Sequence, residues 1–191
     1  MANQILYGFY NLKDRLADTV QAVGIQVIND AIQMTLDEHN RQMNALLEPE
    51  TIEALYEASQ AGVEIDLIVR GPCALRPGVP GLSDNIRVRS VIGRFLEHHR
   101  IFHFHADGAE HMYLSSADWM DRNFFRRIEI AFPVLDPRLK RRVMKEGLRP
   151  YLGDNCQAWD MQADGKYRRK HPRSIRRAAQ LILLKELAAS S

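Results

Sequence analysis

Apolar residues recur along this chain with two different spacings, and the spacing changes at turn-forming residues. From Pro49 to Gly62 they recur every three or four residues, with proline first, acidic residues in the first turn and glycine last, which predicts an amphipathic helix. Residues 63–69 instead form a short, nearly continuous apolar run, which predicts a largely buried strand. A helix followed by a buried strand is typical of an α/β domain.

The rest of the chain continues this mixture of helical and extended patterns. Short alternating or apolar segments predict further strands, and longer segments with helical spacing predict helices. The predicted strands are Arg100–His105, Met112–Ser115 and Arg126–Phe132, and the predicted helices are Ser90–Leu96, Pro137–Arg149 and Pro172–Ala189. The chain therefore predicts an α/β sandwich without internal repeats.

The N-terminal segment has its own pattern. From about Phe9 to Asn40 apolar residues follow helical spacing, although Gly24 weakens the middle, so one long helix or two short ones are expected. We therefore divide the chain into a helical extension, residues 1–40, and a domain, residues 41–191. An apolar stripe from Leu12 to Leu36 has to be buried, either on its own domain or on a second copy, and we favour self-association.

Composition restricts the function. With 46% hydrophobic and 26% charged residues, the 191-residue chain has the composition of an ordinary globule, and its net charge of +2 provides no global field for nucleic acid or membrane. Its two cysteines, Cys73 and Cys156, suggest reduced thiols in a cytosolic protein. The start has no basic segment followed by a long apolar run, and no run approaches membrane-spanning length. We expect a cytoplasmic protein without nucleic-acid or membrane partners.

Basic residues are concentrated in two segments. These run from Arg122 to Arg142 and from Lys166 to Arg177. Such runs are usually solvated faces, and a surface for a polyanion is the alternative.

Candidate chemistry begins where the buried strand ends. Arg70 follows this strand and precedes a loop rich in glycine and proline, residues 71–81; a loop of that length is commonly functional. Ligands of open α/β sheets gather at the carboxyl ends of strands, where a guanidinium can clamp a phosphate. From position alone, an arginine paired with a core carboxylate is the favoured interpretation.

Two further candidates lie at the start of the next predicted strand. His98 and Arg100 are two positions apart, so their side chains are expected on one face. A lone histidine is more often a packed or surface residue. His103 and His105 repeat this spacing, but no Asp, Glu or Cys stands at ligand spacing, so we assign no metal site.

Several motifs together resemble a known family. They are V-R-G at Val69–Gly71, L-E-H-H-R-I-F at Leu96–Phe102, S-S-A-D-W-M-D-R-N at Ser115–Asn123 and L-D-P-R-L-K at Leu135–Lys140. From about Met43 onward the chain resembles the last domain of the ATP-dependent polyphosphate kinases, a branch of the phospholipase D-like fold. The resemblance implies an α/β domain with a mixed β-sheet flanked by helices. It does not extend to the N-terminus, where Gln42 replaces a lysine of the family pattern.

The resemblance also implies roles for individual residues. Arg70 matches a phosphate-binding arginine of the nucleotide site, and the H-x-R at His98 and Arg100 looks like a degenerate copy of the H-x-K motif. His98 would give general acid–base assistance or bind phosphate, and Arg100 would bind phosphate. Ser115, Ser116 and Asp118, followed by Asn123 and Glu129, stand where the superfamily lines its phosphate pocket, although turn chemistry and capping explain them equally well. Ser83, Asp84 and Asn85 are loop residues that could order the Arg87 and Arg89 segment over a phosphate chain.

The resemblance covers only part of a complete kinase. In that family the phosphorylated histidine and the arginines that hold Mg²⁺ lie in other domains, so the metal is expected without ligands in this chain. The function implied is the C-terminal domain of a polyphosphate kinase, which binds ATP or ADP and polyphosphate in reversible transfer of the terminal phosphate of ATP, and which is inactive alone. The alternative is a stand-alone, non-catalytic domain that binds polyphosphate, forms a homo-oligomer or associates with the missing kinase domains. A homodimeric phosphodiesterase is disfavoured because Arg100 replaces the lysine.

Overall fold

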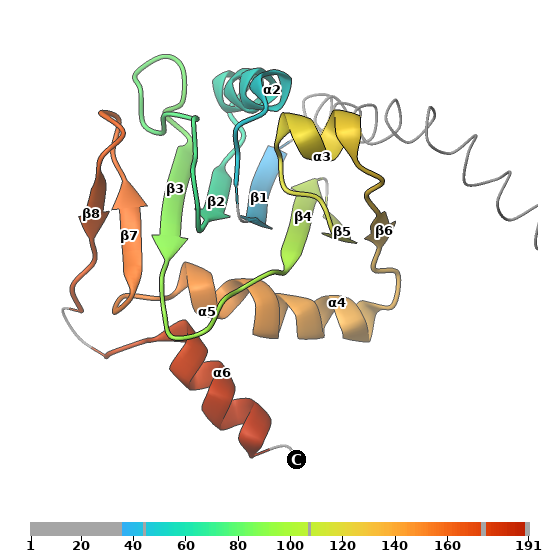
Figure 1. Cartoon of the computed structure of the whole chain (residues 1–191), viewed down its shortest axis with the longest axis vertical. Helices are drawn as coiled ribbons and strands as arrows, with labels where there is room; N and C mark the ends of the chain where they lie inside the picture. The colour runs from blue at the N-terminus through green and yellow to red at the C-terminus, as the bar shows by residue number, and fades with distance from the viewer. Residues whose placement is uncertain (1–35, 44, 107, 173–174, 190–191) are drawn as a thin grey trace, which may run out of the picture.

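The computed structural model describes residues 36–43, 45–106, 108–172 and 175–189. Eight strands form one mixed sheet in the order β6-β5-β4-β1-β2-β3-β7-β8 (Figure 1). The strands are β1 Leu36–Met43, β2 Ile65–Val69, β3 Ile86–Val91, β4 Arg100–Ala106, β5 Ala109–Ser115, β6 Ala131–Pro133, β7 Ala158–Met161 and β8 Tyr167–Arg169. The helices are α2 Pro49–Gln60, α3 Asp121–Arg126, α4 Pro137–Val143, the π-helical turn η1 Met144–Leu148, α5 Arg149–Leu152 and α6 Ala179–Ala188.

The centre of the sheet is parallel and its two margins are antiparallel. β1, β2 and β3 run in one direction, and β4 and β7 flank them in the opposite direction. A parallel pair needs a crossover connection, which α2 provides between β1 and β2. The carboxyl ends of β1, β2 and β3 therefore meet at one edge of the sheet.

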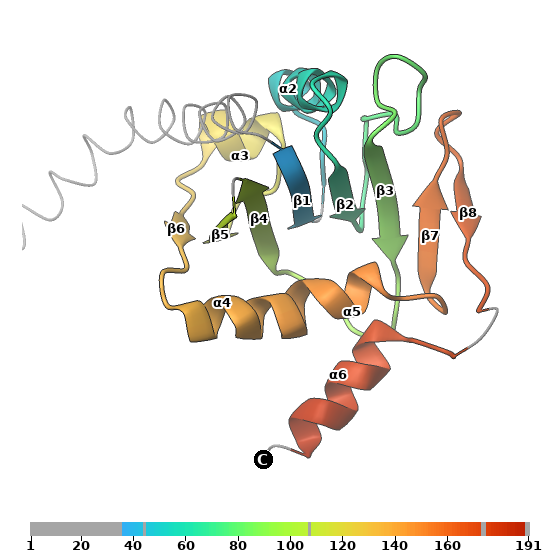
Figure 2. The same ribbon diagram turned by 180° about the vertical axis from the view of Figure 1, so that it is seen from behind.

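Helices cover both faces of the sheet. α2 and α3 lie on one face, and the continuous helix α4–η1–α5 lies with α6 on the other; the two views agree on this arrangement (Figures 1 and 2). Leu55, Leu67 and Phe102 belong to the core beneath α2. Ile68 and Ile101, which neighbour them in sequence, belong to the opposite core with Leu148. Successive side chains along each strand point to opposite faces of the sheet, so the same strands contribute residues to two cores.

Local sequence explains the ends of the first described helix. The Glu48 carboxylate accepts hydrogen bonds from the backbone N–H groups of Glu50 (3.1 Å) and Thr51 (2.6 Å), and Pro49 occupies the first turn. These are donors that a helix leaves unpaired at its start. Gly62 has a φ of 96°, a conformation that favours glycine, and ends the segment. The helix predicted from Pro49 to Gly62 is confirmed.

The helix predicted from Pro137 is also confirmed, as three continuous helical pieces that extend to Leu152. Its middle piece is π-helical and contains Gly147. A Cβ at Gly147 would lie only 2.3 Å from Cδ1 of Ile101, so the glycine allows the helix to approach β4 closely. Among the described residues, no helix combines the length and the apolar character needed to cross a membrane.

Other sequence predictions need correction. The segment predicted as a helix, Ser90–Leu96, contains the end of β3 followed by irregular chain. In the segment predicted as a strand, Arg126–Phe132, only Ala131 and Phe132 belong to β6. The helical pattern from Pro172 becomes a helix only at Ala179.

The N-terminal prediction divides at Leu36. Residues 36–40, predicted as helical, belong to strand β1, which pairs with both β2 and β4. The pairing partners on either side favour the extended conformation over the local helical spacing. The remainder of the predicted helical extension, and most of the apolar stripe, lie outside the described residues.

Candidate functional site

The candidate residues lie along one edge of the sheet. Arg70 follows β2, Arg100 begins β4, and Ser115, which ends β5, pairs with Arg100 in the sheet. At a spacing of about 4.8 Å per strand, Arg70 is about 10 Å across the sheet from Arg100, because β1 lies between their strands. We refer to this region as the carboxyl edge.

The chain that follows β1 holds the carboxyl edge together. Leu46 accepts a backbone hydrogen bond from Ala74 (2.9 Å) and donates one to Pro72 (3.0 Å), just after Arg70. On its other side Leu47 donates to the carbonyl of Trp119 (2.8 Å), just after Asp118. The segment after β1 therefore fixes the loops that carry Arg70 and Asp118 on either side of it.

Arg70 stands at the end of β2 as the sequence predicted. Its side chain is partly exposed, and its carbonyl oxygen accepts a hydrogen bond from Oγ of Ser90 on β3 (3.1 Å). This bond ties the end of β2 to β3 and fixes the backbone that carries the guanidinium.

Arg100 is bound to a buried carboxylate. Its Nε lies 3.0 Å from Oδ1 of Asp118 and its Nη2 lies 2.9 Å from Oδ2, a bidentate pair. The side chains of Arg100 and Asp118 are only 17% and 10% exposed. The hydrogen bonds that Arg100 donates to Asp118, with the charges of Asp118 and Glu129, raise the pKa of Arg100 although burial opposes this. Sequence analysis placed Asp118 in a phosphate pocket; it also orients Arg100.

His98 lies before the strand and not on it. β4 begins at Arg100, so the expectation that His98 and Arg100 share one face of a strand is wrong. Nη1 of Arg100 instead donates a hydrogen bond to the carbonyl oxygen of His98 (2.6 Å), and the His98 side chain is exposed. His98 belongs to the loop 92–99, which connects β3 to β4 across the ends of β2 and β1.

A polar cluster that sequence analysis missed fixes this loop. Oε1 of Glu97 accepts hydrogen bonds from the Tyr151 hydroxyl (2.7 Å) and from Nε2 of Gln180 (2.9 Å), and Oε2 lies 3.2 Å from Nδ1 of His99. Gln180 also bonds both backbone groups of Phe95, at 2.9 Å and 2.8 Å. The loop is thus anchored to α5 and α6.

The charge state of Glu97 follows from these contacts. Burial disfavours the carboxylate, but hydrogen bonds from His99, Tyr151 and Gln180 outweigh it and lower the pKa of Glu97 from 4.5 to about 2. His99, which sequence analysis treated as a spacer, therefore supports the loop; its ring also packs 5.4 Å from that of Tyr151. The L-E-H-H-R motif could be recognised in the sequence, but Tyr151 and Gln180, which bond to its glutamate, are more than fifty residues away.

The polar residues after β5 bond mainly to each other. Oγ of Ser116 donates to Oε2 of Glu129, and Nδ2 of Asn123 donates to Oε1 of the same carboxylate. Oγ of Ser115 accepts from the backbone N–H of Ala117 (3.0 Å). These contacts fit the turn-and-capping interpretation and place a carboxylate next to the carboxyl edge.

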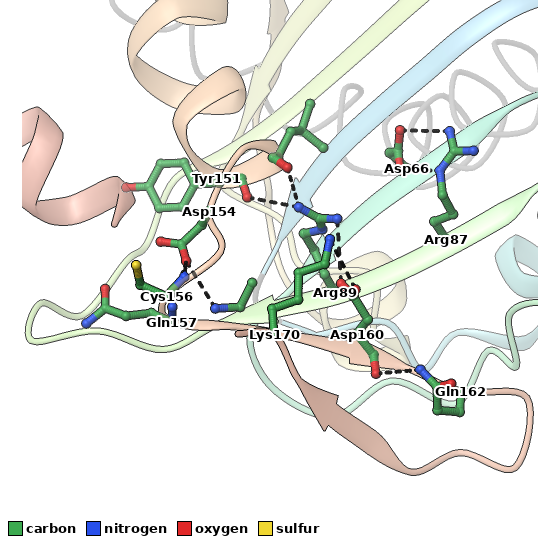
Figure 3. A network of polar contacts seen from close by, with 12 residues as sticks. Asp66, Arg87, Arg89, Tyr151, Asp154, Cys156, Gln157, Asp160, Gln162 and Lys170 are labelled. Carbon is green, nitrogen blue, oxygen red and sulfur yellow. Dashed lines mark hydrogen bonds and ion pairs between the residues drawn. The ribbon is translucent and has the colours of Figure 1, made fainter. Parts of the chain in front are cut away.

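The arginines of β3 engage protein groups. Arg87 pairs with Asp66 (2.8 Å) and Glu64 (2.7 Å), and hydrogen bonding to Asp66 raises its pKa despite burial. Figure 3 shows Arg89 between the carbonyl groups at the end of α5 and Asp160, whose carboxylate lies 3.5 Å away. Both arginines therefore have roles within the fold.

The loop residues suggested to order these arginines bond elsewhere. Oγ of Ser83 donates to the carbonyl of Arg76 (2.7 Å), Asp84 accepts from Gly81, and Asn85 donates to the carbonyl of Ser59 on α2. They stabilise the loop itself and its contact with α2.

A metal site is not formed by the part of the chain that the structure describes. There, no group of three or more His, Cys, Asp or Glu side chains is placed to hold a metal ion. We derive no chemical step through the Mg²⁺ that the resemblance implies.

Comparison with known proteins first defines the class of fold. Nuc, a phospholipase D family member from Salmonella typhimurium, superimposes with a TM-score of 0.50 over 71% of this chain and 89% of its own, at 14% sequence identity. That likeness concerns the fold alone, which is the phospholipase D-like fold. A polyphosphate kinase from Porphyromonas gingivalis gives a TM-score of 0.78 at 38% identity, and covers 93% of this chain and 27% of its own.

Sequence comparison defines the family. The model for the polyphosphate kinase C-terminal domain 2 matches residues 11–180, so this chain belongs to the polyphosphate kinase C-terminal domain family. The polyphosphate kinase of Burkholderia multivorans is 71% identical over 143 residues, which are 75% of this chain and 21% of the relative. That of Burkholderia lata is 63% identical over 165 residues, which are 82% of this chain and 24% of the relative. The chain thus spans about a fifth to a quarter of these relatives.

Proposed function

We propose that this chain is the phosphate-binding C-terminal domain of a polyphosphate kinase, which acts in reversible transfer of the terminal phosphate of ATP to polyphosphate. The observation that carries the proposal is the carboxyl edge, where Arg70, the loop with His98, and Arg100 are gathered by the topology of β1, β2 and β4. Membership of the family supports it.

Each proposed residue has a chemical task. Arg70 binds phosphoryl oxygens through its guanidinium, whose fork of donors suits them. Arg100 uses three of its donors on Asp118 and His98, and a guanidinium carries five N–H groups, so two remain for a phosphate oxygen. His98, whose side chain is exposed, exchanges a proton with a bound phosphate in this proposal. The phosphorylated nucleophile and the Mg²⁺ would come from other domains.

The experiment is calorimetric titration of the whole chain with polyphosphate and with ATP. We expect polyphosphate to bind more tightly than a single phosphate, with affinity that falls as salt rises. Arg70→Ala should weaken binding by about 1.5–3 kcal/mol, the range for hydrogen bonds to charged groups. The matched control is Arg138→Ala on α4, which should bind as wild type. An unchanged dissociation constant for Arg70→Ala would remove Arg70 from the site.

Activity distinguishes the two proposed roles. With ATP and magnesium the chain alone should neither synthesise polyphosphate nor form an acid-labile phosphohistidine, whereas adding the remaining domains of a close relative should give synthesis that depends on His98. Failure of that mixture, with polyphosphate binding intact, would favour the non-catalytic binding domain. Robust synthesis by the chain alone would instead make His98 part of a complete site.

A further inference from the structure

A basic pocket lies outside the carboxyl edge, between the β7–β8 hairpin and the start of α6. Its volume is about 360 Å³, and none of the described residues that line it is acidic. Three of these residues are basic, Arg169, Arg176 and Lys185, and the others are Cys156, Gln157, Ala178, Leu181 and Ile182. The segment from Lys166 to Arg177 that stood out in the sequence therefore contributes two cations to one concave surface.

The three cations have no carboxylate partner among the described residues, unlike their neighbours. Lys170 lies 3.2 Å from Asp160, and Lys145 lies 3.5 Å from Glu186 on α6. Arg169 is held by protein groups that carry no charge: its Nη2 donates to the carbonyl of Cys156 (3.3 Å), and its guanidinium lies 5.8 Å from the centre of the Trp159 ring. The basic pocket therefore carries positive charge that no carboxylate of the described residues neutralises.

The walls of the basic pocket are fixed by a buried carboxylate and an amide. Asp154 is 1% exposed and accepts hydrogen bonds from the backbone N–H groups of Cys156 and Gln157 (Figure 3). It also accepts one from the backbone N–H of Ala179, and so joins the start of β7 to α6. Asn155 bonds the backbone of Ile175 (2.9 Å) and Arg177 (2.8 Å) on either side of Arg176. Preorganised walls reduce the entropy lost when a ligand binds.

We propose that the basic pocket binds a stretch of a linear phosphate chain, at a distance from the phosphates held at Arg70. This inference rests on the proposed function, which supplies polyphosphate as the ligand. Leu181 and Ile182 line the pocket beside its cations, which are solvent-exposed and attract an anion with a strength that falls as salt rises. A nucleic acid fits less well, because none of the described lining residues is aromatic and the Trp159 ring lies under Arg169.

The position of the basic pocket allows one polymer to occupy both sites. Gln157, which lines the pocket, and Gln180 on α6 both lie against Gly93, in the loop that carries His98. A chain long enough to reach from the carboxyl edge past this loop would bind the second site as an intramolecular event, which raises the overall affinity. A phosphate chain too short to reach both sites would gain no affinity from the basic pocket.

The test compares long-chain polyphosphate with tripolyphosphate in calorimetric titrations of the full chain. Arg176→Gln with Lys185→Gln should weaken long-chain binding about threefold to tenfold, the range for two solvent-exposed charge contacts. The same double variant should leave tripolyphosphate binding at the carboxyl edge unchanged. Arg138→Gln with Arg141→Gln on α4 removes the same charge outside the pocket and should bind long chains as wild type.

Other results would contradict the pocket, the proposed function or the assigned ligand. If long-chain binding depends on Arg70 but is equal in wild type and the pocket variant, or falls equally in the α4 control, the basic pocket is not a site while the proposed function stands. If the wild-type chain binds no polyphosphate, both the basic pocket as a site and the proposed function are wrong. Equal affinity for a single-stranded oligonucleotide of the same charge, lost in the same variant, would overturn the assignment to a phosphate chain.

Thiol alkylation gives a second measurement that does not depend on affinity. Cys156 lines the basic pocket, so in a Cys73→Ser chain, where Cys156 is the one thiol left, saturating long-chain polyphosphate should slow its alkylation. Sodium chloride at equal ionic strength is the control and should not protect it. Alkylation at the same rate with and without polyphosphate would place the bound polymer elsewhere.

Discussion

Arg100 illustrates how a candidate phosphate-binding residue also holds the candidate site in position. The bidentate pair with Asp118 joins the start of β4 to the segment after β5, and the bond to the His98 carbonyl fixes the end of the loop. A lysine could not reproduce the planar bidentate pair, because its three N–H donors diverge from a single nitrogen on a flexible stem. The arginine in the H-x-R motif is therefore a positioning group as well as a phosphate-binding candidate.

Glu97 provides a prediction about stability and pH. Its pKa falls from 4.5 to about 2 in the folded chain, so the ionised carboxylate stabilises the fold above pH 4.5, and this contribution is lost as pH falls towards 2. Its side chain is 19% exposed, so solvent screens the contacts only partly. We expect Glu97→Gln to lower the free energy of unfolding at pH 7 by about 1–3 kcal/mol.

Urea unfolding at pH 7 and pH 3 measures this effect. The difference between wild type and Glu97→Gln should shrink at pH 3, where the wild-type carboxylate begins to lose its advantage. Glu53→Gln, at an exposed position on α2, is the matched control and should change little at either pH. A difference that is the same at both values would show that ionised Glu97 does not stabilise the loop.

Among the elements, α6 gives the loop 92–99 its conformation. Gln180 is 5% exposed and pairs with both backbone groups of Phe95, as a neighbouring strand would, while Leu181 and Leu184 beside it are half exposed. The first turn of α6, which contains Gln180, therefore makes the contacts that hold the loop 92–99. This loop pairs with no strand among the described residues.

This arrangement predicts a local effect of Gln180→Ala. The amide of Phe95 and its neighbours in the loop should exchange hydrogen faster, because a buried pair of bonds worth about 1–3 kcal/mol is lost. Hydrogen exchange followed by mass spectrometry on peptides that cover residues 92–99 measures this. Leu184→Ala on the exposed side of α6 should leave the loop unchanged. Loop protection equal to wild type in Gln180→Ala would mean that Glu97 and Tyr151 suffice.

The elements also show what the sequence could predict. α2, β2, β4 and β5 were predicted because their periodicity and end signals agree with the packing. The segment Ile128–Ile130 failed because its alternation of apolar residues resembles a buried strand, although Ile128 and Ile130 are 64% and 56% exposed. Residues 36–40 failed because pairing with β2 and β4 overrides local helical spacing. Neither cause is local in sequence.

For the candidate site, too, features with local sequence signals were predicted and long-range contacts were not. The position of Arg70 at a strand end followed from a buried run and a glycine, both local signals. The contacts of Glu97 with Tyr151 and Gln180 depend on helices that follow much later in the chain, so spacing could not reveal them. The pocket around Arg176 and Lys185 was visible only as a basic run, because the bond that joins its walls links Asp154 to Ala179, far apart in sequence.

On the scale of the whole molecule, one group of exposed apolar side chains lies at one end of the sheet. β6 pairs with β5 and is the last strand on that side. Large apolar side chains near it are about half exposed or more, namely Phe125, Ile128, Ile130, Phe132, Leu135 and Leu139. We call this surface the β6 edge. A terminal strand with such neighbours favours association with another protein surface.

The last prediction is that the chain self-associates, with the β6 edge as one contact surface and residues 1–35 as the other candidate. The average mass from light scattering should rise with protein concentration. Ile130→Lys with Phe132→Lys should shift the chain towards the monomer, because two charges would have to be buried. Leu187→Lys, at a half-exposed position on α6, is the control and should associate as wild type.

Deletion of residues 1–35, which leaves β1 intact, separates the two surfaces. Loss of association in the deletion variant alone would assign the contact to the N-terminal segment, as the apolar stripe from Leu12 suggested. Loss in the lysine variant alone would assign it to the β6 edge. A wild-type chain that remains strictly monomeric at every concentration contradicts self-association through either surface, and would leave the β6 edge as a surface for the remaining domains of a kinase.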